Sequence, residues 1–132
     1  MIANLLPLVF LALQPVAGAT GAADEAQAQG EARSSAPALN ASQQGAIRCS
    51  AAFAMMAERQ AQGDTAALEY PPLALRGQEF FVRSNAQLMD EAGLDRATMR
   101  SLMRAEAQAI VADGSLHDLM QPCLLLLDAS GL

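Results

Sequence analysis

Apolar residues in this chain recur at the spacing of an α-helix from Gln44 to the C-terminal end. They stand three or four positions apart, which places them on one face of a helix. Gly63, Gly93 and Gly114 separate the runs, and glycine often ends a helix because it readily adopts the left-handed backbone conformation. The alternation of apolar and polar residues that is typical of strands appears nowhere. The sequence therefore predicts an all-α fold.

Four helices are predicted between these breaks. Their expected ranges are about 42–62, 72–92, 96–113 and from residue 115 onward. Asp95 is the predicted N-cap of the third helix, and Pro72 suits the first turn of the second because a proline there loses no helical hydrogen bond. The connections are short, which favours antiparallel neighbours, so the prediction is a small four-helix up-down bundle.

The third and fourth helices each carry an apolar pattern. The third is expected to contribute Met99, Leu102, Met103, Ile110 and Val111 to the core, and the fourth repeats Leu116, Leu119, Met120, Cys123, Leu124 and Leu127. Ser115 begins the fourth helix, and Asp118 stands three residues later, in the position of a capping box. Pro122 predicts a kink just before Cys123, because proline removes a helical hydrogen bond.

Cys49 and Cys123 are the only cysteines in the chain. In an up-down bundle the first and fourth helices are antiparallel neighbours, which brings both cysteines to the same end and onto apolar stripes. The core is rich in alanine and has no tryptophan, so a covalent link would add stability that burial alone does not supply. The sequence therefore predicts a structural Cys49–Cys123 disulfide. A redox-active pair is the alternative, but such pairs usually have Cys-x-x-Cys spacing.

Residues 1–19 resemble a secretory signal peptide. An apolar run from Leu5 to Leu13 is followed by small residues, and Ala17 and Ala19 predict cleavage after Ala19, with Ala22 as a second choice. The segment before the run contains no Lys or Arg. A membrane anchor is the competing interpretation, but the run is shorter than the roughly twenty residues that span a bilayer. We therefore expect a periplasmic or secreted protein with no stable membrane anchor after cleavage.

Residues 20–43 are rich in Ala, Gly, Ser, Gln and Glu, without an apolar period. This composition predicts a disordered linker, and residues 44–132 are then the helical domain. The triplet Asn40-Ala41-Ser42 matches a glycosylation signal, which we interpret as a chance match.

The charge of the chain excludes one class of partner. Its eight basic residues are all Arg, against fourteen Asp and Glu, for a formal charge of −6. Nucleic-acid binding requires clustered Lys and Arg in excess, so a nucleic-acid partner is not expected. Paired carboxylates for glycoside chemistry, a phosphate loop and Cys-x-x-Cys metal spacing are absent from the sequence, which predicts a protein that is not an enzyme and needs no cofactor.

Arg96, Arg100 and Arg104 lie four residues apart, which lines three guanidinium groups along one edge of the third helix. Such an edge is a candidate partner-binding surface, because Arg donates paired hydrogen bonds to carboxylates or phosphates. A solvated face, paired with Asp or Glu of a neighbouring helix, explains the same spacing more simply.

His117 is the only histidine in the chain. Together with Asp113, Asp118 and Met120 it suggests a weak copper site, but Gly114 interrupts the helix between Asp113 and His117. No metal ligand is predicted from these residues.

The predicted helical domain is rich in methionine: Met55, Met56, Met89, Met99, Met103 and Met120. These side chains either fill gaps between alanine-rich helices or form an adaptable binding surface.

The stretch from Cys49 to the end contains YPPLALRGQEFFVRSNAQLMDEAGLDR and closes with PCLLLLD. It resembles small uncharacterised two-cysteine exported helical proteins of Gram-negative bacteria, a resemblance that implies no activity. The design is also similar to acid-activated periplasmic chaperones in architecture alone. The predicted function is that of a non-catalytic protein-binding or chaperone-like module, whose partner is an envelope protein or a second copy. The alternative is a copper-binding or redox accessory protein of the cell envelope.

Overall fold

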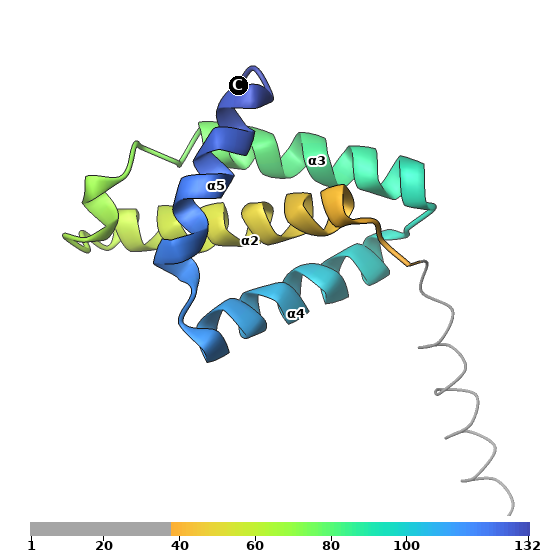
Figure 1. Ribbon diagram of the computed structural model, residues 1–132, viewed down its shortest axis with the longest axis horizontal. Coiled ribbons are helices and arrows are strands. Elements are labelled where there is room, and N and C mark those ends of the chain that lie inside the picture. The colour runs from red at the N-terminus through yellow and green to blue at the C-terminus, as the bar shows by residue number, and fades with distance from the viewer. Residues whose placement is uncertain (1–37) are drawn as a thin grey trace, which may run out of the picture. The chain divides into compact units, whose positions relative to one another are not determined.

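The computed structural model describes residues 38–132, and this part of the chain is all-helical, with no strands (Figure 1). Its elements are α2 (Ala41–Ala61), a short 3-10 helix η1 (Ala67–Glu69), α3 (Arg76–Ala92), α4 (Arg96–Asp113) and α5 (Leu116–Ala129). For residues 38–132, the prediction of an all-α fold with four helices is confirmed. The predicted signal peptide and most of the predicted linker lie outside the described residues.

The N-terminal end of α2 has a capping interaction that the sequence interpretation did not assign. The Asn40 side chain accepts a hydrogen bond from the Gln43 backbone N–H at 2.9 Å, and the Gln43 side chain accepts one from the Asn40 N–H at 3.0 Å. Two backbone donors that a helix start leaves unpaired are thereby satisfied. Residues 41–43, which the composition assigned to a linker, are therefore helical.

Replacing Asn40 by alanine is expected to lower the free energy of unfolding by about 1 kcal/mol, because the N–H of Gln43 loses its acceptor. Ser42→Ala is the matched control, since Ser42 is exposed in the same turn and takes no part in the cap. Urea unfolding followed by circular dichroism measures both. Equal effects of the two changes would contradict the role of Asn40.

The glycines predicted to end helices do so. Gly93 and Gly114 are the C-caps of α3 and α4, with φ values of 64° and 69°, and Gly63 follows the last turn of α2 with φ of 77°. The helix starts differ more from expectation. α3 begins at Arg76 rather than at Pro72: residues 71–73 form no regular structure, and residues 74 and 75 form a turn that leads into the helix.

Ser115 occupies the N-cap position of α5, but its side chain makes no capping hydrogen bond. The predicted capping box with Asp118 is therefore wrong. The reason is local: Ser115 has φ of −80° and ψ of 2°, whereas a capping side chain needs an extended backbone at this position. Its N–H instead donates to the Asp113 carboxylate at 3.0 Å, within the tight turn that joins α4 to α5.

Asp95 caps α4 as predicted, accepting the Thr98 N–H at 2.7 Å. Hydrogen bonds from Thr98, chiefly from its backbone N–H, hold the pKa of Asp95 below its ordinary value of 3.8. A lowered folded-state pKa means that the carboxylate stabilises the fold above the unfolded pKa, and that this contribution is lost as the pH falls through the folded pKa.

The Asp95→Asn variant keeps a capping oxygen that does not titrate. Its free energy of unfolding should therefore differ from that of the wild type by a constant amount above about pH 5. Below the ordinary pKa of 3.8 the wild type should lose stability faster than the variant. Denaturant unfolding between acidic and neutral pH measures the difference, and parallel pH profiles would contradict the assignment.

α2 lies at the centre of the fold and packs against α3, α4 and α5 (Figure 1). The first three long helices run alternately back and forth, but α5 crosses α2 and α3 at a steep angle. The regular up-down bundle expected from the short connections is therefore not confirmed. A three-residue 3-10 helix and the turn before α3 connect α2 to its neighbour, and a tight turn sets the new direction of α5.

The core is built around the middle of α2. Ala52, Phe53 and Met56 are fully buried, and the Phe53 ring meets the Phe80 ring of α3 edge to face, with centroids 5.4 Å apart. Gly77 lets α3 come close at this point, since a Cβ there would lie 3.2 Å from the Phe53 Cβ. A smaller cluster lies toward the N-terminal end of α2 and is formed by Ile47, Leu88, Leu94 and Met99.

Candidate functional site

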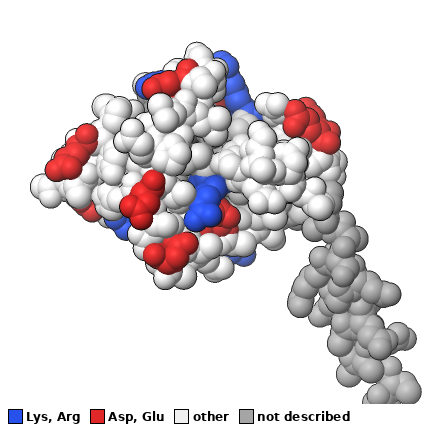
Figure 2. Space-filling view, viewed as in Figure 1, with Lys and Arg blue, Asp and Glu red and all other residues white. Residues whose placement is uncertain are grey.

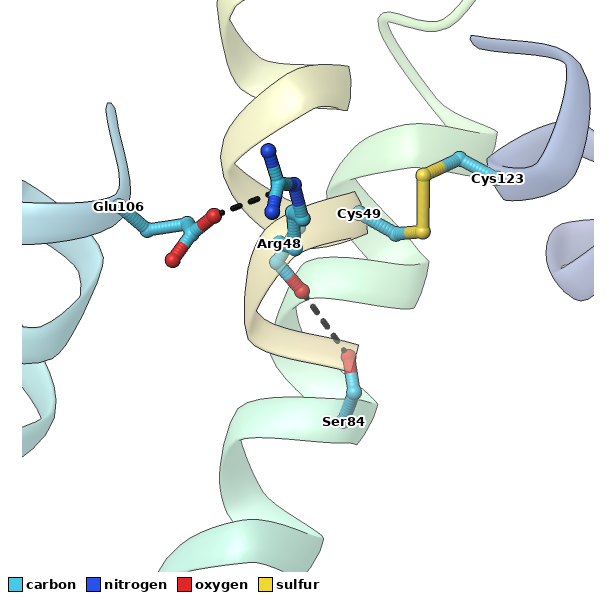
Figure 3. Close-up of a disulfide and its surroundings, with 6 residues drawn as sticks. Arg48, Cys49, Ser84, Glu106 and Cys123 are labelled. Carbon is cyan, nitrogen blue, oxygen red and sulfur yellow. Dashed lines mark hydrogen bonds and ion pairs between the residues drawn. A yellow bond between two sulfur atoms is a disulfide. The ribbon is translucent and has the colours of Figure 1, made fainter. Parts of the chain in front are cut away.

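Three consecutive residues in the middle of α2 join it to its three neighbours (Figure 3). Arg48 reaches the acidic residues of α4, Cys49 forms a disulfide with α5, and the Ser50 hydroxyl lies 3.2 Å from the Ser84 hydroxyl of α3. Successive residues of a helix point about 100° apart, so three in a row can face three partners. We call these residues the α2 junction.

The predicted disulfide is present, and it closes the α2 junction on the side of α5. Cys49 and Cys123 are bonded, their Cα atoms lie 5.2 Å apart, and both residues are buried. Its position corrects the expectation that the two cysteines share one end of a bundle. Each lies near the middle of its helix, because two helices that cross steeply approach one another only around one point.

Arg48 holds the acidic residues of α4 against α2. Its guanidinium lies 3.4 Å from Glu106 and 3.6 Å from Asp113. The pKa of Asp113 is below its ordinary value, mainly because of hydrogen bonds from Ser115, with a smaller contribution from the charge of Arg48. Glu106 and Asp113 are the only acidic residues within α4, so both of its negative charges face α2.

Arg96, Arg100 and Arg104 lie on another side of α4, and all three are exposed. Among residues 38–132, the ion pairs are formed by Arg48, Arg76 and Arg83. Arg96, Arg100 and Arg104 take part in none of them. Of the simpler expectation, a solvated face paired with acidic residues of a neighbouring helix, the described residues show the exposure but no such ion pair. We call Arg96, Arg100 and Arg104 the basic edge of α4.

An apolar hollow of about 440 Å³ lies beside the basic edge. It is lined by Met55 of α2 and by Arg104, Ala107, Gln108, Val111 and Ala112 of α4. Val111, which the sequence pattern assigned to the core, is 68% exposed here. The reason lies in the topology: α5 turns away after Gly114 and crosses α2 and α3, so it does not cover this side of α4 (Figure 1).

The basic edge differs from other parts of the surface. On the face shown in Figure 2, acidic side chains are spread among large uncharged areas, and basic side chains lie apart from one another. The whole chain has a formal charge of −6. An edge with three arginines, no carboxylate of its own helix facing it and an apolar hollow alongside is therefore suited to a ligand that is both anionic and apolar.

The residues considered for copper binding do not come together. His117 Nδ1 lies 3.1 Å from the Tyr70 hydroxyl, and the two rings stack at a tilt with centroids 5.8 Å apart. Met120 is fully buried in the core. Within residues 38–132, no group of three or more His, Cys, Asp or Glu side chains is placed to hold a metal ion. The methionines mostly fill the interior, and of them Met55 lines the hollow.

Sequence reasoning found the basic edge but missed the hollow. The spacing of the arginines is visible in the sequence, whereas the exposure of Val111 depends on where α5 runs.

In the described part of the chain, no helix is both long and apolar enough to cross a membrane. Comparisons with protein-family models, with curated proteins and with solved structures found no match.

Proposed function

We propose that this protein is exported to the periplasm or secreted and acts there as a non-catalytic module that binds another protein. The basic edge of α4, together with the apolar hollow beside it, is the proposed binding surface. Its partner is an envelope protein, with a second copy of the chain as the other candidate. Chaperone-like binding of varied clients is included in this proposal.

The basic edge is the observation that carries this proposal. Three exposed arginines without an ion-pair partner among residues 38–132 stand beside a hollow in which Val111 is largely exposed. Exposed apolar patches rimmed by polar residues are typical of interaction sites, and Arg is enriched among the residues that contribute most to protein binding. The disulfide supports export, because disulfides persist in oxidising compartments and are rare in the cytosol.

The proposal is tested by affinity capture from the envelope fraction, with the purified exported protein as bait. A variant with Arg96, Arg100 and Arg104 all changed to alanine is compared with the wild type and with Arg83→Ala. Arg83 is an exposed arginine of α3 that pairs with Glu79 at 2.8 Å, so it controls for the loss of an arginine elsewhere. We expect bound proteins to be lost with the triple variant and kept with Arg83→Ala. The same set of proteins on all three baits would contradict the proposal.

A further inference from the structure

We propose that the partner presents an acidic amphipathic helix, whose carboxylates bind the basic edge and whose apolar side chains enter the hollow beside it. This inference rests on the proposed function and names the chemistry of the segment that is bound. It is carried by the register of the arginines, by the position of the hollow and by the absence of ion pairs to these arginines among residues 38–132.

The arginines of the basic edge are spaced so that they can pair with carboxylates of a second helix. Arg100 and Arg104 are one helical turn apart, so the points where they leave the helix are separated by about 6 Å. Two carboxylates that are also four residues apart on a second helix have the same separation. An antiparallel or parallel helix laid along α4 can therefore place one carboxylate against each guanidinium, and Arg binds carboxylates through two parallel hydrogen bonds.

The hollow continues the same side of α4. Ala107 follows Arg104 by three residues and Val111 follows it by seven, so their side chains lie along the side on which Arg104 stands. Met55 of α2 forms the opposite wall. A partner helix that places its carboxylates on Arg100 and Arg104 thus has its next turns above an apolar hollow, which favours Leu or Met there.

Within residues 38–132, no carboxylate forms an ion pair with the arginines of the basic edge. The acidic residues within α4 are Glu106 and Asp113, and both are held toward α2 by Arg48. An anionic lipid surface fits less well than a helix. A flat membrane would meet the carboxylates of the rest of the protein, which has a formal charge of −6, as well as the basic edge.

The test uses a synthetic peptide about five turns long, with Leu on one face and pairs of Glu spaced four residues apart beside it. Its affinity for the oxidised, exported protein is measured by fluorescence anisotropy at two salt concentrations. We expect saturable binding that weakens as salt increases, because the charges are partly exposed. A scrambled peptide of the same composition should bind at least tenfold more weakly.

Charge-reversal variants of the protein test whether the peptide binds at the basic edge. Arg104→Glu should weaken peptide binding at least tenfold, whereas Arg83→Glu, with the same change of net charge on α3, should leave it unchanged. A peptide with Lys in place of Glu should bind the Arg100→Glu/Arg104→Glu variant more tightly than it binds the wild type. Circular dichroism and urea unfolding of each variant show that the fold is kept.

Three results would overturn the inference. The first is equal binding of the amphipathic and scrambled peptides, and the second is failure of the Lys peptide to bind the reversed variant. The third is binding to vesicles of anionic lipid in the absence of any peptide binding, which would assign the edge to a lipid surface. Since affinity capture does not depend on the peptide, loss of captured proteins with the triple alanine variant would still support the proposed function in the first two cases.

Discussion

Replacing Cys49 and Cys123 together by alanine should lower the free energy of unfolding by about 4 kcal/mol or more. The disulfide closes a loop whose ends are 74 residues apart in sequence, and the chain-entropy estimate for such a loop is about 4.5 kcal/mol. Both residues are buried, so the loss of two sulfur atoms from the core adds to this. A domain is typically stable by only about 5 to 15 kcal/mol, so the variant should lose a large fraction of its stability, and nearly all of it at the lower end of that range.

Urea unfolding of the oxidised wild type, the reduced wild type and the double variant measures this effect. Reduction breaks the same link without removing the sulfur atoms, so the reduced protein should lie between the other two in stability. Ala51→Ser is a useful comparison, because Ala51 is also buried in α2 but takes no part in the link. If reduction shifts the unfolding midpoint no more than this substitution does, the crossing of α2 and α5 is held by packing alone.

The helices and the disulfide could be predicted because their causes are local or countable. The apolar period and the glycines at 63, 93 and 114 fix where helices run and end, since a left-handed residue stops the helix whatever surrounds it. With two cysteines in the chain, only one pairing within the chain exists. The helix prediction required no knowledge of how the helices pack. The disulfide prediction is confirmed although the bundle topology that was used to argue for it is not.

The crossing of α5 could not be predicted, because crossing angles depend on the sizes of facing side chains. The relevant signal is a run of small residues in α2, Cys49, Ser50, Ala51 and Ala52, all of them buried. Small side chains let a second helix approach closely at one place, and the 5.2 Å between the Cα atoms of Cys49 and Cys123 marks that place. The composition of this run indicates close packing, but it does not say which helix approaches.

The exposure of Val111 follows from the same crossing. Its position among the apolar residues of the third helix predicted burial, and Ile110 beside it is indeed buried. The two side chains point in different directions, and only the direction of Ile110 is covered once α5 has turned away. The arginines of the basic edge were visible in the sequence, but the apolar half of the candidate site was not.

A polar side chain at the end of α2 organises the long connection to α3. The Gln60 amide nitrogen lies within hydrogen-bond distance of the carbonyl oxygens of Ala67, Tyr70 and Pro71, at 3.0, 3.2 and 3.0 Å. Its amide oxygen accepts the Leu73 N–H at 3.0 Å. One side chain thus satisfies several backbone groups of a segment that forms few regular hydrogen bonds of its own.

Gln60→Ala is therefore expected to lower the free energy of unfolding by about 2 to 3 kcal/mol. The largest part comes from the Leu73 N–H, because Leu73 is 1% exposed and its donor would lose its partner in a buried place. Gln62→Ala is the matched control, since the exposed Gln62 side chain bonds only to Glu58 on the same helix. Chemical unfolding and amide hydrogen exchange at Leu73 measure the effect, and exchange there should become faster.

Gln60→Glu tests separately the amide oxygen of Gln60, which accepts from Leu73, and its amide nitrogen, which donates to the carbonyl groups. The introduced carboxyl group keeps an acceptor for the Leu73 N–H, but when ionised it places a negative charge against three carbonyl oxygens and loses the amide donor. Its folded-state pKa should therefore be raised, so the variant should be less stable at pH 7 than at pH 4 relative to the wild type. A variant as stable as the wild type at both pH values would show instead that the contact with Leu73, rather than the three carbonyl groups, holds the connection in place.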